Sequence, residues 1–408
     1  MNKNFSILIY FISTFLILNS FPGKIHADEV VIISNPRTPA LKMRIVFNEE
    51  LSIGEVEGDE NYMFGSNIGF NTDDEGNFYV ADYDNTRILK YDPEGKYLLS
   101  FGREGQGPGE FQNLTVPRFD KDNNLYIADT TNRRISFFDR DGNYLRQITV
   151  KERYIDPFVN SKGFIVTNKW EMNQQGNVQK RIFCYGLFND KFELLAELFK
   201  DEYEFQMPTG TDESSLVNYL AKGWSQEVFR PRVRMLLADD DFIYLGWPEK
   251  FEINVYSPEG RLVKKIARDY DPLPVGEKDK EEYFKRLGEG LSSSPQFNED
   301  MIEKVFQKMK FPKFKPAYQS FSLMDNGWLA VIVESVEGEY TLFDIFDRDG
   351  KYIAHFKTPV FDDGMFSSLL FFNNNKAYCV AIEDDYRFAK RYSYKIQEYK
   401  NNKWIKMK

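Results

Sequence analysis

The sequence predicts an all-β protein in which one four-stranded antiparallel sheet is repeated six times and the copies close into a ring. Three observations lead to this prediction. A strand-and-turn pattern of about 40 to 50 residues recurs along the chain. Each strong copy carries the residues of two hairpins. Two of the spacings between copies are much longer and contain helix patterns. Together they predict a six-bladed β-propeller of four-stranded antiparallel blades, with small helical insertions.

Residues 1–27 have the features of a secretory signal. A basic residue precedes the apolar run 5–21, and the small residue Ala27 precedes the acidic Asp28. We expect cleavage after Ala27, which leaves residues 28–408 as the propeller and makes the protein secreted or periplasmic. A retained anchor is the alternative, because the run approaches the length that spans a bilayer. No later run is apolar for so long, so we expect no stable membrane insertion after cleavage.

The first two copies of the repeat match closely. The segment Gly76-Asn-Phe-Tyr-Val-Ala-Asp82 returns as Asn124-Leu-Tyr-Ile-Ala-Asp129, with 47 residues between Tyr79 and Tyr126. Weaker copies of this strand begin near Gly163, Phe242, Gly327 and Ala377. The sequence therefore predicts six blades.

Turn residues separate the outer two strands in four of the copies. The tetrads are Asp92-Pro-Glu-Gly95, Asp139-Arg-Asp-Gly142, Ser257-Pro-Glu-Gly260 and Asp347-Arg-Asp-Gly350. Asp or Ser first and Gly last predicts a type I turn closed by a left-handed glycine. A calcium loop at Asp139 and Asp141 is an alternative, although the other ligands of such a loop are missing.

The first two copies resemble the NHL-repeat family of six-bladed propellers over residues 64–150. The resemblance is carried by the Gly-rich run Phe101 to Phe111, the Tyr-hydrophobic-Ala-Asp strands at Tyr79 and Tyr126, and the Asn-x-Arg-Ile elements at Asn85 and Asn132. The resemblance implies a propeller scaffold, and a scaffold does not define a reaction.

Two motifs in these copies have a structural and a functional interpretation. Asp82, Asn85 and Arg87 form a polar set that the second copy repeats, and a catalytic site is normally built once. We therefore expect its carboxylate and amide to satisfy turn N–H groups. The Gly-rich run 101–111 lacks the Gly-Lys-Ser/Thr ending of a phosphate loop, so we expect a turn between blades.

Long spacings between copies predict insertions at about 201–229 and 270–317. In the second, Asn298 can cap a helix whose apolar stripe is Ile302, Val305, Phe306 and Met309. A shorter helix is expected over 281–287. In the first insertion we expect a helix over 211–222 that Gly223 ends.

Both ends of the mature chain are expected to close the ring. Residues 51–55 stand before the first blade where an outer strand would stand, so we assign them to the last blade, next to residues 392–399. Residues 404–407 compete for the same outer edge.

Composition excludes several classes of function. The net charge of −10 and pI of about 5.1 give no electrostatic footprint for nucleic acid. The 408 residues include only two His and two Cys. These are too few to favour a Cys/His zinc site, a His-assisted nucleophile or a disulfide framework.

The sequence favours an exported binding or interaction scaffold over an enzyme, with a protein, peptide or carbohydrate as its ligand. No acid, base and nucleophile set is fixed at one place in the sequence. The alternative is a calcium-assisted hydrolase or lactonase-like enzyme that uses channel carboxylates, because oxygen ligands need no histidine. We expect no cofactor apart from this calcium, and we assign no catalytic or metal-binding residue.

Position within the repeat predicts where a ligand would bind. Links from an outer strand to the next blade open on the same face as links between second and third strands. We therefore expect both insertions on one face, beside two tryptophan-containing links, and arginines at the starts of innermost strands. The expected ligand-binding residues are Arg118, Lys169, Trp170, Arg232, Arg234, Trp247 and Lys250. Packing of each Trp under an insertion is the alternative.

Overall fold

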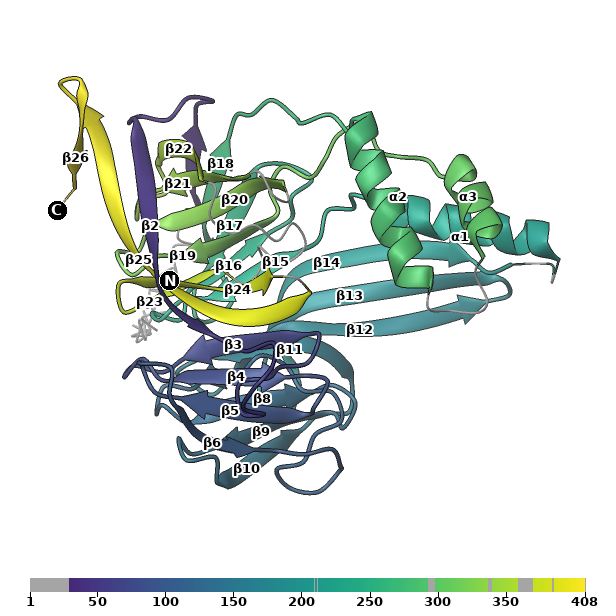
Figure 1. The fold of residues 1–408 in the computed structure, drawn as a ribbon. Coiled ribbons are helices and arrows are strands. Elements are labelled where there is room, and N and C mark those ends of the chain that lie inside the picture. The colour runs from purple at the N-terminus through teal and green to yellow at the C-terminus, as the bar shows by residue number, and fades with distance from the viewer. Residues whose placement is uncertain are drawn as a thin grey trace, which may run out of the picture.

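The computed structural model contains six mostly antiparallel sheets arranged as the blades of a propeller, with a group of helices at one end (Figure 1). It describes residues 29–208, 210, 212–292, 298–336, 340–358, 370–383 and 385–407. The expected signal, residues 1–27, lies outside the described residues and stays a prediction.

Blades 1 and 2 are built from short strands. Blade 1 contains β3 (Ile68–Thr72), β4 (Phe78–Asp82), β5 (Arg87–Tyr91) and β6 (Tyr97–Phe101). Blade 2 contains β7 (Arg118–Phe119), β8 (Leu125–Asp129), β9 (Arg134–Phe138) and β10 (Tyr144–Thr149). Every residue of β4, β8 and β9 is buried, because both faces of these sheets pack against neighbouring blades. Tyr79 and Ala81 of blade 1, for example, share one core with Leu125 and Ile127 of blade 2.

The repeated polar set has the structural role expected of it. The Asp129 carboxylate accepts the backbone N–H groups of Gln112, Asn113, Thr131 and Asn132, at 2.7 to 3.2 Å. Arg134 donates to three carbonyls of the Gly-rich run, those of Gln106, Gly107 and Glu110. The run joins β6 to β7, so it is the turn between blades that the sequence predicted.

Blade 3 has much longer strands than blades 1 and 2. It contains β11 (Arg153–Val159), β12 (Ile165–Gln175), β13 (Val178–Phe188) and β14 (Leu194–Gln206). The three outer strands continue past the ring and stay paired to their ends. We call this projection, residues 170–183 and 201–206, the wing.

Blades 4 and 5 follow the same order as the others. Blade 4 contains β15 (Arg234–Leu237), β16 (Ile243–Gly246), β17 (Glu252–Tyr256) and β18 (Leu262–Arg268), and β1 (Val31–Asn35) adds to its outer edge in parallel. Blade 5 contains β19 (Ser320–Leu323), β20 (Leu329–Val336), β21 (Tyr340–Phe346) and β22 (Tyr352–Thr358).

Both chain ends build blade 6, as predicted. Its strands are β23 (Phe371–Asn373), β24 (Lys376–Glu383), β25 (Tyr386–Lys400) and the outer β2 (Met43–Ile53), which pairs with β25 from Glu398 to Ala389. The C-terminal β26 (Lys403–Lys406) also pairs with β25, and Gln397 and Glu398 face both β2 and β26. The two strands therefore lie on opposite edges of β25 and do not compete.

Three helices occupy the insertions. They are α1 (Glu213–Glu227), α2 (Glu277–Ser292) and α3 (Glu299–Lys308). Their shared core contains Val217, Ala221, Val228, Val305 and Met309, and we call the three helices the cap. The Asn298 side chain caps α3 by accepting the N–H of Met301, as predicted.

Three expectations about the insertions were wrong in detail. Strand β14 runs to Gln206, so residues 201–206 are strand. Helix α1 continues past Gly223, because Trp224 and Val228 contribute to the cap core, and this packing outweighs a glycine cost of about 1 kcal/mol. Helix α2 extends beyond 281–287 at both ends.

Candidate functional site

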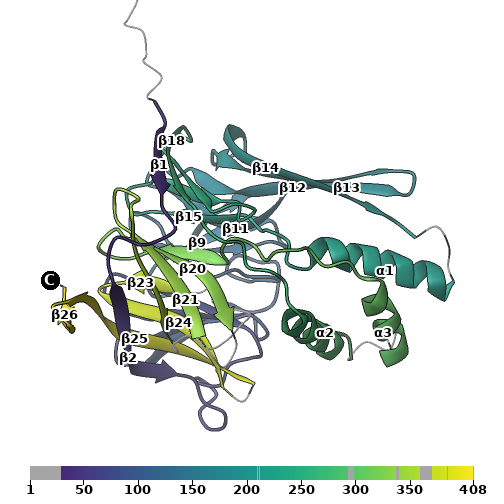
Figure 2. The same ribbon diagram turned by 90° about the horizontal axis from the view of Figure 1, so that it is seen from above.

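Both insertions lie on one face of the propeller, as predicted. Each one links an outer strand to the innermost strand of the next blade. They contact each other through Lys304 Nζ and the Glu213 carboxylate at 2.8 Å, and through Lys308 Nζ and Asn218 Oδ1 at 2.9 Å. In Figures 1 and 2 the cap stands beside the wing at one end of the molecule. We call this side of the propeller the insertion face.

The two tryptophans of the predicted site have different surroundings. Trp247 and Lys250 lie in the link between β16 and β17, where they were expected. Trp170 was expected in a link and is instead a residue of β12, paired with Phe183 of β13. The link was misplaced because β12 and β13 stay hydrogen-bonded for five further residue pairs beyond Trp170.

Four aromatic side chains form a row across the wing, which we call the aromatic row: Trp170, Phe183, Tyr203 and Phe205. Adjacent ring centroids are 6.0 Å apart from Trp170 to Phe183, 5.9 Å from Phe183 to Tyr203 and 5.1 Å from Tyr203 to Phe205. The first two contacts are stacked, with interplanar angles of 25° and 6°. All four rings are half-buried. Because the strand register places them on one face of the sheet, they form a continuous apolar surface.

Arginines lie over this row. The guanidinium carbon of Arg153 is 4.8 Å from the centroid of the Trp170 ring, and that of Arg181 is 4.4 Å from the Phe205 ring. Arg230 lies 3.7 Å from the Tyr203 ring and binds the Asp201 carboxylate at 2.6 Å. Burial raises the pKa of Asp201, and Arg230 offsets only part of that rise. The wing therefore presents ring surfaces and fixed cationic donors side by side.

Trp247 lies near the base of the wing. Its ring centroid is 5.3 Å from that of Phe199, which is 6.2 Å from Tyr185 in turn. Burial raises the pKa of Tyr185 to about 12, so this phenol stays neutral. Within the described residues, neither Trp247 nor Trp170 belongs to the cap core, whose tryptophan is Trp224. Packing beneath an insertion stays an alternative prediction for these two side chains.

Arg118 lies at the start of an innermost strand, as expected, but its charge is already paired. Its Nη2 is 2.5 Å from the Asp156 carboxylate, and its guanidinium lies 3.9 Å from the centre of the Phe158 ring. Burial acts to lower the pKa of Arg118, but the combined effect of Asp156, Tyr126 and Tyr83 outweighs it and the pKa is raised. Arg118 therefore joins blade 2 to blade 3.

The other predicted cations lie at separate places. Arg234 begins β15 and donates through Nε to the carbonyl of Gln319, which links blades 4 and 5. Burial, followed by the charge of Arg232, lowers its pKa. Arg232 is 3.5 Å from Glu227. Lys169 precedes Trp170 in β12, so it lies on the opposite face of the sheet. The structure does not bring the seven predicted residues together at one site.

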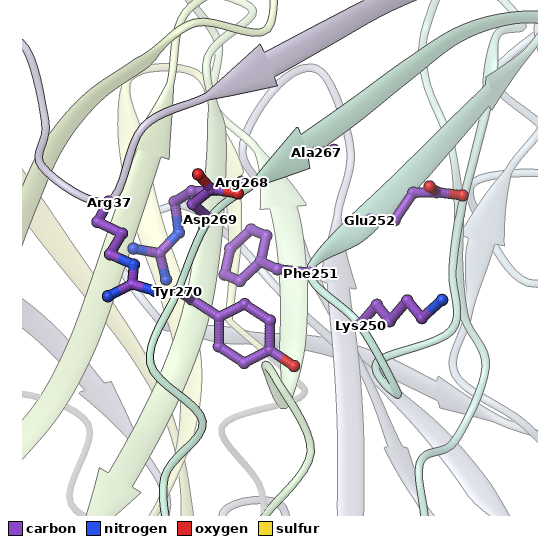
Figure 3. A pocket seen from close by; sticks show the side chains of 8 residues that line it. All are labelled: Arg37, Lys250, Phe251, Glu252, Ala267, Arg268, Asp269 and Tyr270. Carbon is purple, nitrogen blue, oxygen red and sulfur yellow. The ribbon is translucent and has the colours of Figure 1, made fainter.

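A pocket lined by Lys250 lies beyond the end of β18 (Figure 3). Its volume is about 300 Å³, and the rings of Phe251 and Tyr270 stand between Lys250 and two arginines. Both arginines are engaged, Arg37 by Asp271 at 2.8 Å and Arg268 by Asp344 at 2.9 Å. The charges of these two arginines are therefore already paired within the protein.

The expected calcium alternative receives no support from side-chain clustering. In the described part of the chain, no three His, Cys, Asp or Glu side chains are grouped as a metal site would need. The Asp139 carboxylate, part of the candidate calcium loop, accepts the backbone N–H groups of Asp141 and Asn143 within its turn. Calcium binding stays a prediction, which the metal content of purified protein would test.

Most of the aromatic row was missed from the sequence. Only Trp170 was among the predicted residues, and Phe183, Tyr203, Phe205 and their arginines were not. One signal was present: Glu202-Tyr203-Glu204-Phe205 alternates with the period of a strand whose two faces differ. Extending the outer strand through this segment would have placed both rings on one face.

Comparisons with known proteins agree with the architecture. A model of the DUF5128 family, described as a 6-bladed beta-propeller, matches residues 60–218. No curated protein matches the sequence. A solved structure from Bacteroides fragilis NCTC 9343, provisionally described as an exported protein, is similar with 11% identity and a TM-score of 0.50, covering 91% of this chain and 100% of that one.

Two further solved structures are similar at lower scores. A DUF4221 family member from Bacteroides vulgatus has 9% identity and a TM-score of 0.48, with 88% of this chain and 99% of that one covered. Virginiamycin B lyase from Staphylococcus aureus has 9% identity and a TM-score of 0.40, with coverages of 86% and 99%. In the part of the chain that the structure describes, none of the helices has both the length and the apolar character needed to cross a membrane. The sheet order and the family match over residues 60–218 together identify the fold as a six-bladed β-propeller.

Proposed function

We propose that the protein is an exported binding scaffold that holds an acidic oligosaccharide, or a ligand of the same chemistry, on its insertion face. The observation that carries the proposal is the aromatic row with its arginines. Export is supported by the signal-like residues 1–27 and by the provisional description of the similar Bacteroides fragilis protein.

The aromatic row lies outside the packed cores of the propeller, although Arg230, which follows α1, contacts it at Tyr203. In the described residues, its four rings belong to none of the hydrophobic clusters between the blades or within the cap. A wing that only extended a sheet would be stable with polar side chains on both faces, as its other face shows through the ion pairs of Lys180 and Lys200 with Glu202 at 2.6 Å each. The concentration of rings on one face is therefore better explained by binding.

The chemistry of the row fits a sugar ring that carries negative charge. The apolar face of a sugar packs against an aromatic ring, and carboxylates or sulfates accept bidentate hydrogen bonds from guanidinium groups. Arg153 and Arg181 flank the row at Trp170 and at Phe205, so a chain of several sugars could meet both a ring and a cation more than once. A rigid paired sheet holds these groups in place, which limits the entropy lost on binding.

Binding of an oligosaccharide panel, both acidic and neutral, to the mature protein would test the proposal by calorimetry. We expect acidic chains to bind and Trp170→Ala or Arg181→Ala to weaken binding about tenfold or more, the effect of losing one strong contact. Ile182→Ala is the matched control, because Ile182 lies in β13 between Arg181 and Phe183 and faces the other side of the sheet.

Absence of binding across the panel, or equal losses in Ile182→Ala and Trp170→Ala, would contradict the proposal. Thermal unfolding of each variant separates loss of a contact from loss of the fold.

A further inference from the structure

A second surface of the molecule has a concentration of cations and rings, far from the wing. It is formed by β2, β25 and β26, and in both Figures 1 and 2 β26 stands at the end of the molecule opposite the cap. The register places Gln397 of β25 opposite both Arg44 and Lys406, and Tyr399 opposite Trp404. One face of this sheet therefore carries Lys42, Arg44, Lys395, Lys406, Tyr399 and Trp404, and we call it the basic face.

Contacts within the basic face hold its cations over its rings. The Arg44 guanidinium lies 4.3 Å from the centroid of Trp404, and Lys42 Nζ lies 4.3 Å from the centroid of Tyr399. The two rings meet edge to face at 5.2 Å. Arg44 Nε also donates to Gln397 Oε1 at 2.8 Å. The cations are thus held in one layer above the rings.

In the part of the chain that the structure describes, no carboxylate forms an ion pair with the cations of this layer. Lys42, Arg44, Lys395 and Lys406 are all exposed. The nearby Glu398 belongs to the other face of the sheet and binds Lys400 at 2.7 Å. Glu50, farther along β2, binds Lys376 at 2.7 Å and Arg391 at 3.5 Å. Four positive charges therefore stand together on a chain whose net charge is −10.

The two faces of this sheet differ in what covers them. Met43, Ile45 and Phe47 point to the other side and join the core shared with blade 5, and Met407 packs against that core. On the basic face, the described residues place neither Tyr399 nor Trp404 in a hydrophobic cluster. No part of the described chain covers the basic face as blade 5 covers the opposite side.

We propose that the basic face docks the protein onto an anionic lipid surface. Each Lys or Arg near such a surface contributes about 1 kcal/mol, and Trp and Tyr favour the boundary between headgroups and acyl chains. The four cations of the basic face are exposed, so their charges are free to meet a layer of headgroups.

The acidic charge of the rest of the molecule would set the orientation of the protein on the lipid surface. At physiological salt, screening limits surface electrostatics to about 8 Å, so a basic tip that stands away from the body acts independently of the total charge. The rest of the chain is repelled by the same surface. Docking through this tip leaves the cap and the wing facing away from the lipid, at the opposite end of the molecule.

Co-sedimentation of the mature protein with lipid vesicles would test the proposal. We expect binding to phosphatidylcholine vesicles that contain about one third phosphatidylglycerol, little binding to pure phosphatidylcholine, and release as the salt concentration rises. Arg44→Glu combined with Lys406→Glu should weaken binding at least tenfold, and Trp404→Ala should weaken it less. Both substituted cations are exposed, so the fold should survive.

The matched control is a double variant that changes the net charge by the same amount but lies far from the basic face. Lys121→Glu with Lys191→Glu alters two exposed turn residues of blades 2 and 3, and binding should change by less than twofold. Equal losses in the two double variants would overturn the proposal, as would equal binding to neutral and anionic vesicles or no binding to either.

Discussion

Blades 2 and 3 are neighbours with the same strand order, yet their third strands have opposite relations to solvent. Strand β9 has five residues and all are buried, whereas β13 has eleven and its first six are half-buried. Phe137 in β9 belongs to the core between blades 2 and 3, and Phe183 in β13 lies in the wing. The third strand of the repeat therefore packs against a neighbouring blade in blade 2, whereas in blade 3 part of it forms an exposed surface.

The difference shows where this propeller is constrained by closure and where it is not. A ring of blades needs each sheet to be covered on both faces, which fixes strand length and burial near the axis. Residues that extend beyond the ring escape this requirement. The cap and the aromatic row both occur there, on the insertion face.

Substitution of the two phenylalanines would sharpen this comparison most strongly. Phe137→Ala should lower the free energy of unfolding by about 4 kcal/mol, because the side chain is 1% exposed and leaves a cavity. Phe183→Ala should lower it by about 1 kcal/mol, since its ring is half-buried and local contacts can relax. Urea unfolding followed by circular dichroism gives both values.

The oligosaccharide experiment on the same two proteins completes the comparison. Phe183→Ala should lose affinity for the acidic oligosaccharide, and Phe137→Ala should keep it at temperatures where the protein is folded. A large loss of stability in Phe183→Ala would mean that the wing is part of the core, contrary to its placement here.

Two hairpin glycines offer a second and smaller contrast. Gly142 closes the turn between β9 and β10 at φ +80°, and a Cβ there would lie 2.6 Å from the Phe101 ring. Gly176, at the tip of the wing, has φ +59° and open space around its Cβ position. Gly142→Ala should therefore cost about 3 kcal/mol from backbone strain and overlap together, and Gly176→Ala about 1 kcal/mol from strain alone.

Thermal unfolding of the two alanine variants would measure this contrast. Equal effects would show that the Phe101 ring moves aside at little cost. The packing of blade 1 against blade 2 would then be looser than the structure indicates.

The repeat explains which parts of the fold could be predicted from sequence. Asp129 and Gly142 have counterparts 47 residues earlier, in Asp82 and Gly95, so their turn roles follow from the comparison of two copies. Closure by β2 followed from the same spacing. The length of the wing did not follow, because Glu171 to Gln175 contains mostly polar residues, and only cross-strand pairing with β13 makes that segment a strand.

The candidate site was harder to predict for a related reason. Trp170 and Phe183 are 13 positions apart, and Phe183 and Tyr203 are 20 apart, so their contact depends on the register of three strands. Arg118 and Arg234 were placed correctly on innermost strands, but sequence alone could not show that Asp156 and the Gln319 carbonyl already engage them. The position of a residue in the repeat predicts on which face of the propeller it lies. The pairing register of neighbouring strands determines which side chains meet on that face.

The polar face of the wing provides the smallest test, through Glu202. Hydrogen bonds from Lys180 and Lys200 lower the pKa of this carboxyl to about 2, from an ordinary value of 4.5. A carboxyl whose pKa is lower in the folded than in the unfolded state adds stability above its unfolded pKa, and that stability is lost as pH falls through the folded value. We therefore expect a small contribution at neutral pH that fades between pH 4.5 and about 2.

The difference in unfolding free energy between the wild type and Glu202→Gln should accordingly shrink as pH falls across this range. It should also shrink with added salt at neutral pH, because exposed ion pairs are screened. Glu204→Gln is the control, since Glu204 lies on the same face of β14 and the described residues show no ion pair to its carboxylate. A difference for Glu202→Gln that stayed constant with pH would mean that the two lysines do not hold this carboxylate, and that the wing depends on its aromatic row and backbone pairing alone.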